Sequence, residues 1–189
     1  MLAGCTIDEA IIYGLSMSGL VIRTPEVASF YVETFADHPD TFVTYKMLRM
    51  QGDLLTKGQL QLLGLRTNTK ISRQFYETLN DEGLIDPFDS ACAIALSISN
   101  TICSRRDIHR LFNAMGPHHK LRAIPSNMAA GPCVNAIKLG GVRLKANEAM
   151  LFPLPGCDRG GQCACRWTLD NIFFEDEDHA SLSSQLQLE

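Results

Sequence analysis

The sequence lacks a segment that is both long and apolar enough to cross a membrane. The apolar run near its start, residues 10–22, is short, contains Gly14 and Gly19, and follows the acidic pair Asp8 and Glu9. A membrane helix needs about 20 mostly apolar residues, and a secretory signal places positive charge before its apolar stretch. We therefore expect a cytoplasmic protein that does not associate with membranes.

The sequence also lacks a strong excess of charge of either sign. Lysine and arginine number 17 against 21 acidic residues, which gives a formal net charge of −4 over 189 residues. The chain as a whole is therefore not attracted electrostatically to nucleic acid, although a local basic patch is compatible with this balance. Hydrophobic residues make up 46% of the chain, which is enough for a packed core.

Several catalytic motifs are missing as well. The sequence has no His-x-Glu followed by Pro-Cys-x-x-Cys, no G-x-S-x-G, no H-E-x-x-H and no glycine-rich phosphate loop. A cysteine nucleophile assisted by His109, His118 or His119 stays open, because a sequence does not show which residues are neighbours in space. Nothing marks one cysteine as activated. We therefore favour a non-catalytic protein and keep a cysteine-dependent hydrolase as the second alternative.

The first 116 residues carry many start and stop signals of helices. Thr6 and Glu9 are spaced as a capping box before residues 8–20, and Thr24-Pro25 marks a second start. Gly83 and Gly116 stand where helices are expected to end. Apolar spacing predicts further helices over about residues 40–50, 60–65, 69–79, 91–102 and 108–115. Asp86-Pro87 or Asp89 is expected to open the fourth of these, and residues 104–107 precede the last.

The pattern changes after Pro117. Short strands are predicted at Lys120–Ile124, Val142–Leu144 and Arg166–Leu169, with a hairpin turn at Gly140-Gly141. The acidic and then Ser/Gln-rich end is expected to be mobile. The predicted fold is mainly α: a helical domain at 1–116, a small β-rich, cysteine-bound appendage at 117–174, and an acidic and polar tail at 175–189.

Four of the seven cysteines lie in the β-rich region. Cys133 comes first, and Cys157, Cys163 and Cys165 follow in a C-x5-C-x-C pattern among glycines and prolines. Thiols presented on tight turns are typical ligands of a tetrahedral Zn²⁺ ion. Clustered thiols in a reducing compartment are also more often metal ligands than disulfides. We predict that these four cysteines hold one structural zinc.

Two alternatives to this zinc site stay open. The four cysteines could be unligated thiols, or His118 or His119 could replace one of them as a ligand. The other three cysteines, Cys5, Cys92 and Cys103, are expected to be structural thiols.

The cysteine segment resembles the C-terminal segment of Mu F-like phage head-morphogenesis proteins and related bacterial proteins. The resemblance is carried by the first cysteine, Leu139-Gly140-Gly141, Glu148-Ala149, the LPGC sequence and the final C-x-C-R, all within residues 133–166. The chain departs from the family pattern at Ala136, where the family has a second cysteine, and at Ala164, where it has an arginine. The resemblance implies a metal-binding fold for the four cysteines and a phage or mobile-element setting.

Residues 56–85 are a second candidate site. A short helix, a turn and a longer helix here resemble the helix-turn-helix of winged-helix regulators, in which one helix meets phosphates and base edges. The turn is longer than usual, and a helix rather than a wing is expected after Pro87, so an ordinary helical hairpin is the alternative. The side chains that would contact nucleic acid are Arg66, Asn68, Lys70 and Arg73.

Together these patterns predict a zinc-stabilised intracellular interaction or regulatory protein that is not catalytic and acts on a protein partner. A DNA-binding regulator that uses residues 56–85 is the first alternative.

Overall fold

The computed structural model describes residues 4–36, 43–116, 119–125, 133–140, 142–157, 163 and 165–170. These residues form a mainly helical molecule with one small three-stranded sheet, so the prediction of a mainly α fold is confirmed. The predicted tail at 175–189 lies outside the described residues. In the part that is described, no helix is long and apolar enough to cross a membrane.

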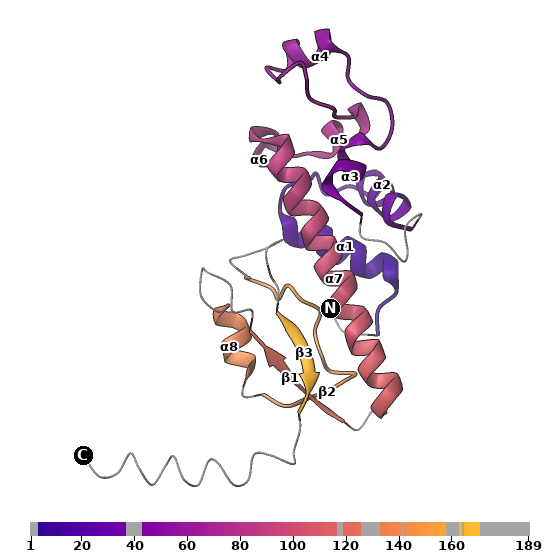
Figure 1. Cartoon of the computed structure of the whole chain (residues 1–189). Helices are drawn as coiled ribbons and strands as arrows, with labels where there is room; N and C mark the ends of the chain where they lie inside the picture. Colours follow the sequence, from indigo (N-terminus) through magenta and orange to yellow (C-terminus); the bar gives the residue numbers. More distant parts are fainter. Residues whose placement is uncertain are drawn as a thin grey trace, which may run out of the picture.

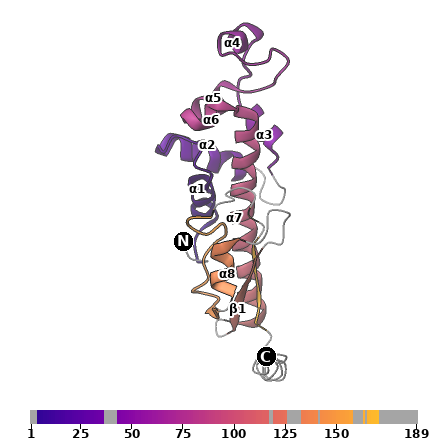
Figure 2. The ribbon, with the colours of Figure 1, turned by 90° about the vertical axis from the view of Figure 1, so that its left-hand side faces the viewer.

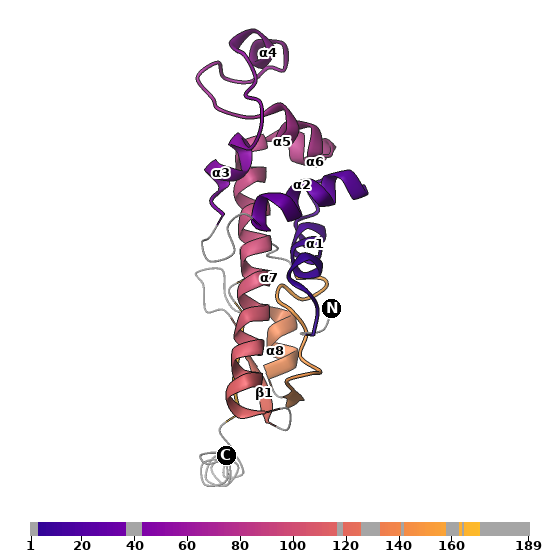
Figure 3. The ribbon, with the colours of Figure 1, turned by 90° about the vertical axis from the view of Figure 1, so that its right-hand side faces the viewer.

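Helix α7 (Pro87–Met115) runs along most of the molecule, as Figures 1, 2 and 3 show. Asp86 caps its start by accepting hydrogen bonds from the backbone N–H groups of Phe88 and Asp89. We expected two helices separated near residues 104–107, and this is wrong, because α7 is continuous over 29 residues. It ends at Gly116, where the domain boundary was predicted.

Helices α1 (Ile7–Ser18) and α3 (Tyr45–Met50) pack against α7, and α2 (Pro25–Ala36) packs against α1. The capping box of Thr6 and Glu9 at the start of α1 is confirmed. Helix α1 lies so close to α7 that a Cβ atom on Gly14 would be 2.7 Å from the Cα atom of Ile98. Helix α3 begins after Thr44, whereas its expected start at Asp40 lies outside the described residues.

Three short helices lie beyond the far end of this group: α4 (Lys57–Leu62), α5 (Arg73–Thr78) and α6 (Asp81–Ile85). Gly83 lies inside α6 rather than at the end of a helix, so that expectation is wrong. The carbonyl oxygen of Leu20 lies against Gly83, and it leaves no room there for a Cβ atom.

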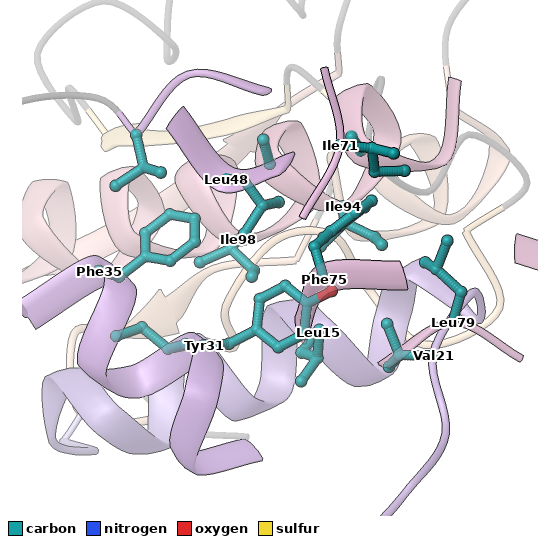
Figure 4. Packing of buried hydrophobic residues seen from close by; sticks show 14 of the residues in the cluster. Leu15, Val21, Tyr31, Phe35, Leu48, Ile71, Phe75, Leu79, Ile94 and Ile98 are labelled. Carbon is teal, nitrogen blue, oxygen red and sulfur yellow. The ribbon is translucent and has the colours of Figure 1, made fainter. Parts of the chain in front are cut away.

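The apolar side chains of these helices form one cluster, which we call the helical core. Its largest fully buried members include Tyr31, Leu48, Phe75, Ile94 and Ile98 (Figure 4). The Tyr31 hydroxyl group makes a hydrogen bond of 2.9 Å with Thr78 Oγ1. The phenol is therefore buried without an unsatisfied polar group.

The second half of α7 lies beside a three-stranded antiparallel sheet (Figure 1). Strand β1 (Lys120–Ile124) is central, with β2 (Leu144–Lys145) and β3 (Arg166–Leu169) on its two sides. Two predicted strands are thus confirmed, and the third begins at Leu144 rather than Val142. Helix α8 (Val134–Gly140) was not expected. Gly140 is its last residue, and Gly141, the other residue of the predicted hairpin turn, lies outside the described residues.

A second apolar cluster joins the sheet to the helices, and we call it the cysteine core. Ala10 of α1 and Ile108 of α7 pack there with Leu121 of the sheet. Trp167 of β3 donates a hydrogen bond from Nε1 to the Met150 carbonyl at 2.8 Å, and its ring lies 5.2 Å from that of Phe152. The sheet is therefore packed against α7, and Ala10 joins α1 to the same cluster.

Candidate metal centre

Cys133 and Cys157 are positioned by two short structural elements that contact each other. Cys133 directly precedes α8, and its carbonyl accepts a hydrogen bond from the backbone of Ile137 at 2.9 Å. Cys157 follows a turn in which Gly156 has a φ of 72°, a conformation that favours glycine. The side-chain amide of Asn135 in α8 donates to the Pro155 carbonyl at 3.2 Å. This hydrogen bond ties α8 to the loop that carries Cys157.

Helix α1 holds the other side of that loop. The Tyr13 hydroxyl group donates a hydrogen bond to the Pro153 carbonyl at 2.9 Å, across 140 positions of sequence. Burial raises the pKa of Tyr13, and negative charge on Cys157 and Cys163 raises the pKa further. Tyr13 is therefore a neighbour of the cysteines. The sequence did not indicate this role for Tyr13, because the residue lies within an ordinary apolar run.

The sulfur atoms of Cys133 and Cys157 are 3.9 Å apart. A disulfide would place them about 2.05 Å apart, and none of the seven cysteines, all of which the structure describes, forms a disulfide. Two thiolates on one tetrahedral zinc, each with a Zn–S bond of about 2.3 Å, would have sulfur atoms about 3.8 Å apart. The observed distance therefore fits two ligands of one ion.

Cys163 and Cys165 complete the group. Both side chains are buried, and Cys165 directly precedes β3. Burial strongly raises the pKa of Cys163, the backbone N–H of Cys165 opposes this rise, and negative charge on Cys165 and Cys157 adds to it. Cys163 thus lies within electrostatic range of both neighbours, and the four predicted cysteines come together.

Spacings within the cysteine cluster are 3.7–4.3 Å, which is compatible with metal binding. Nevertheless, the described residues contain no ready-made metal site. In this part of the chain, no group of three or more His, Cys, Asp or Glu side chains is arranged to hold an ion. A tetrahedral site would therefore require the sulfur atoms to move from the positions described here.

The remaining candidate ligands and thiols are placed elsewhere. His119 is exposed beside the start of β1, and His118 lies outside the described residues. Cys5 packs against the edge of the cysteine core, while Cys92 and Cys103 lie along α7.

A cysteine nucleophile needs a lowered pKa, and three of the thiols show the opposite. Burial is the largest influence on Cys5, Cys103 and Cys163, and it raises the pKa of each. None of these three thiols therefore has the lowered pKa that a nucleophile needs. This does not favour the hydrolase alternative at these positions.

The helix expected to carry the candidate nucleic-acid contacts is shorter in the structure than predicted. The helix expected from about residue 69 begins at Arg73, with Ser72 as its cap, so Asn68 and Lys70 lie in the preceding loop. Hydrogen bonds from Ser72 N–H to the Arg49 carbonyl and from Arg73 N–H to the Asp53 carbonyl fix this start. Arg66, Asn68 and Lys70 instead line a cleft.

Comparison of the chain with models of known protein families, with characterised proteins and with solved structures found no match.

Proposed function

We propose that the cysteine cluster binds one Zn²⁺ ion, with Cys133, Cys157, Cys163 and Cys165 as ligands, and that the protein acts as a zinc-stabilised, non-catalytic interaction protein. The observation that carries this proposal is the convergence of four thiols from separate segments, two of them 3.9 Å apart. Four thiolates would leave no open coordination position, so the role of the metal would be structural.

The side chains of the cysteine core support a need for the metal. Its fourteen buried residues include five alanines and three cysteines, which bury little apolar surface. The strands beside it are only five, two and four residues long. A bound ion would cross-link α8, the loop before Cys157 and β3, and its binding energy would contribute to folding.

Helix α8 supplies a surface for a protein partner. Val134 and Ile137 are 57% and 50% exposed and lie three positions apart, so they share one face of the helix. The helix directly follows the ligand Cys133, so zinc would hold this apolar face in place. We expect the partner to cover it with apolar side chains of its own. A phage or mobile-element setting stays a prediction from the sequence resemblance.

Metal analysis of the protein purified without added zinc tests the proposal. We expect about one zinc per chain, and we expect the metal to be lost in Cys163→Ser. Cys92→Ser is the matched control, since Cys92 is a thiol of α7 outside the cluster. Metal-free protein with all cysteines titrating as free thiols would rule the site out.

A further inference from the structure

A cleft of about 640 Å³ lies between the loop that joins α4 to α5 and the start of α7. Its volume is within the range of small-molecule binding sites, roughly 300–1,000 Å³. It lies in the helical half of the molecule and shares no lining residue with the cysteine cluster. The side chains that give it chemical character are Arg49, Arg66, Asn68, Thr69, Lys70 and Phe88.

The cleft is locally basic in a chain of net negative charge. Arg49, Arg66 and Lys70 line it, and Asp86 is the acidic residue beside them. The Asp86 carboxylate already accepts the backbone N–H groups of Phe88 and Asp89 at 2.9 and 3.1 Å. Across the described ranges, no ion pair joins any of the three cations to a carboxylate. Their positive charge is therefore available to an anion.

Arg49 contacts two aromatic rings, while its Nε–H group has no hydrogen-bond acceptor among the described residues. The carbon atom of its guanidinium group lies 4.6 Å from the ring centre of Phe88 and 5.6 Å from that of Tyr45. Its Nε atom is buried and makes no hydrogen bond within the structure as described. A stacked, fixed guanidinium is suited to planar recognition of phosphate or carboxylate.

The loop that carries the other two cations is fixed by its own turn. The backbone N–H and the hydroxyl group of Thr69 both donate to the Arg66 carbonyl, at 3.1 and 2.6 Å. The opposite wall is apolar, with Pro87, Phe88 and Ile85, whose side chain is 84% exposed. The loop between α4 and α5 therefore contributes two cations to the cleft, and Arg49 adds a third against Phe88 at the apolar start of α7.

The geometry points to a small ligand of the nucleotide class, in which phosphate groups meet Arg49, Arg66 and Lys70 and an aromatic ring lies on the apolar wall. A concave site of this volume suits a small molecule better than duplex DNA, which is read by an element that projects into a groove. Arg73, the one cation in α5, does not line the cleft.

Calorimetric titration of the full chain with ADP, pyrophosphate and adenosine tests this assignment. We expect ADP to bind more tightly than either fragment, because it alone can use both walls. Arg66→Ala and Lys70→Ala should each weaken ADP binding about tenfold, as expected for one lost charge-assisted hydrogen bond. Arg73→Ala is the matched control, since it removes the same charge outside the cleft and should leave the affinity unchanged.

Three results would overturn the assignment. The first is an absence of ADP binding, and the second is an equal loss of affinity in Arg66→Ala and Arg73→Ala, which would indicate diffuse charge. The third is salt-dependent binding of duplex DNA without ADP binding, which would assign the cations to nucleic acid. Metal analysis of the same samples keeps this test separate from that of the zinc site.

Discussion

The two apolar clusters on α7 are built from different kinds of side chain. Of the fifteen buried residues in the helical core, only Ala91 and Ala95 are small, and the rest include Tyr31 and Phe75. Among the fourteen buried residues of the cysteine core, five are alanine and three are cysteine. Hydrophobic burial grows with apolar area, so the helical core has much the larger share of it. The cysteine core therefore depends more on specific links between its segments.

Those links also differ in kind. Helices α1, α3, α4 and α5 are each capped by a local serine or threonine. The cysteine core is joined by contacts between distant segments, such as Tyr13 with Pro153 and Ser104 with Phe152. The helical core has such contacts in addition to its caps, for example between Tyr31 and Thr78. Zinc would add one more such contact. The comparison implies that each core can be weakened separately, and single substitutions can test this.

The largest effect is expected for Phe75→Ala in the helical core. Removing this fully buried ring should lower the free energy of unfolding by about 3–5 kcal/mol, since it deletes apolar contacts and leaves a cavity. Chemical denaturation followed by far-ultraviolet circular dichroism measures the loss. Zinc content should be unchanged in native conditions. A loss of zinc would contradict the independence of the two cores.

Gly14→Ala should destabilise the protein by about 1–3 kcal/mol, because the added methyl group would meet Ile98 across the α1–α7 contact. The carbonyl of Gly14 also accepts a hydrogen bond from Ser97 Oγ at 2.7 Å, and this bond holds α1 close to α7. Gly58→Ala is the control, since nothing lies within 4 Å of the methyl group it would add. Equal thermal stability of the two variants would show that the helices are not packed this tightly.

Two tyrosines allow the two cores to be compared directly. Tyr31 in the helical core and Tyr13 beside the cysteine core each make one hydrogen bond through the hydroxyl group. Tyr31→Phe should cost about 1 kcal/mol of global stability, with no effect on zinc affinity. Tyr13→Phe removes the contact with the Pro153 carbonyl and should lower stability by a similar or smaller amount. It should also weaken zinc binding measured by competition with a chelator. Identical zinc affinities in the two variants would separate Tyr13 from the metal centre.

Local signals were enough to predict several elements. The Thr6–Glu9 capping box and the Asp86-Pro87 start of α7 depend on residues within one helical turn, and both are confirmed. Residues 104–107 carried the same kind of signal and misled the prediction. In the structure, Ser104 Oγ accepts from the Phe152 N–H and Arg105 Nε donates to the Cys5 carbonyl, so these polar groups serve distant segments. A sequence pattern does not show such pairs.

The sequence also predicted part of the candidate metal centre. The spacing of the four cysteines on turns marked them as a group, and the structure brings them near one another, while their role as zinc ligands stays a prediction. Tyr13, Asn135 and Arg49 were missed, because each acts through contacts that the fold creates. Nothing in their sequence neighbourhoods distinguishes them from ordinary helical residues.

The most direct test of the central claim is the emission of Trp167 during removal of zinc by a chelator. Trp167 is the sole tryptophan, and it lies in the cysteine core, so its fluorescence reports that region alone. We predict that chelation exposes the indole and shifts its emission to longer wavelength, while the helical signal in circular dichroism is largely kept. An unchanged emission spectrum in protein shown to be metal-free would contradict the account.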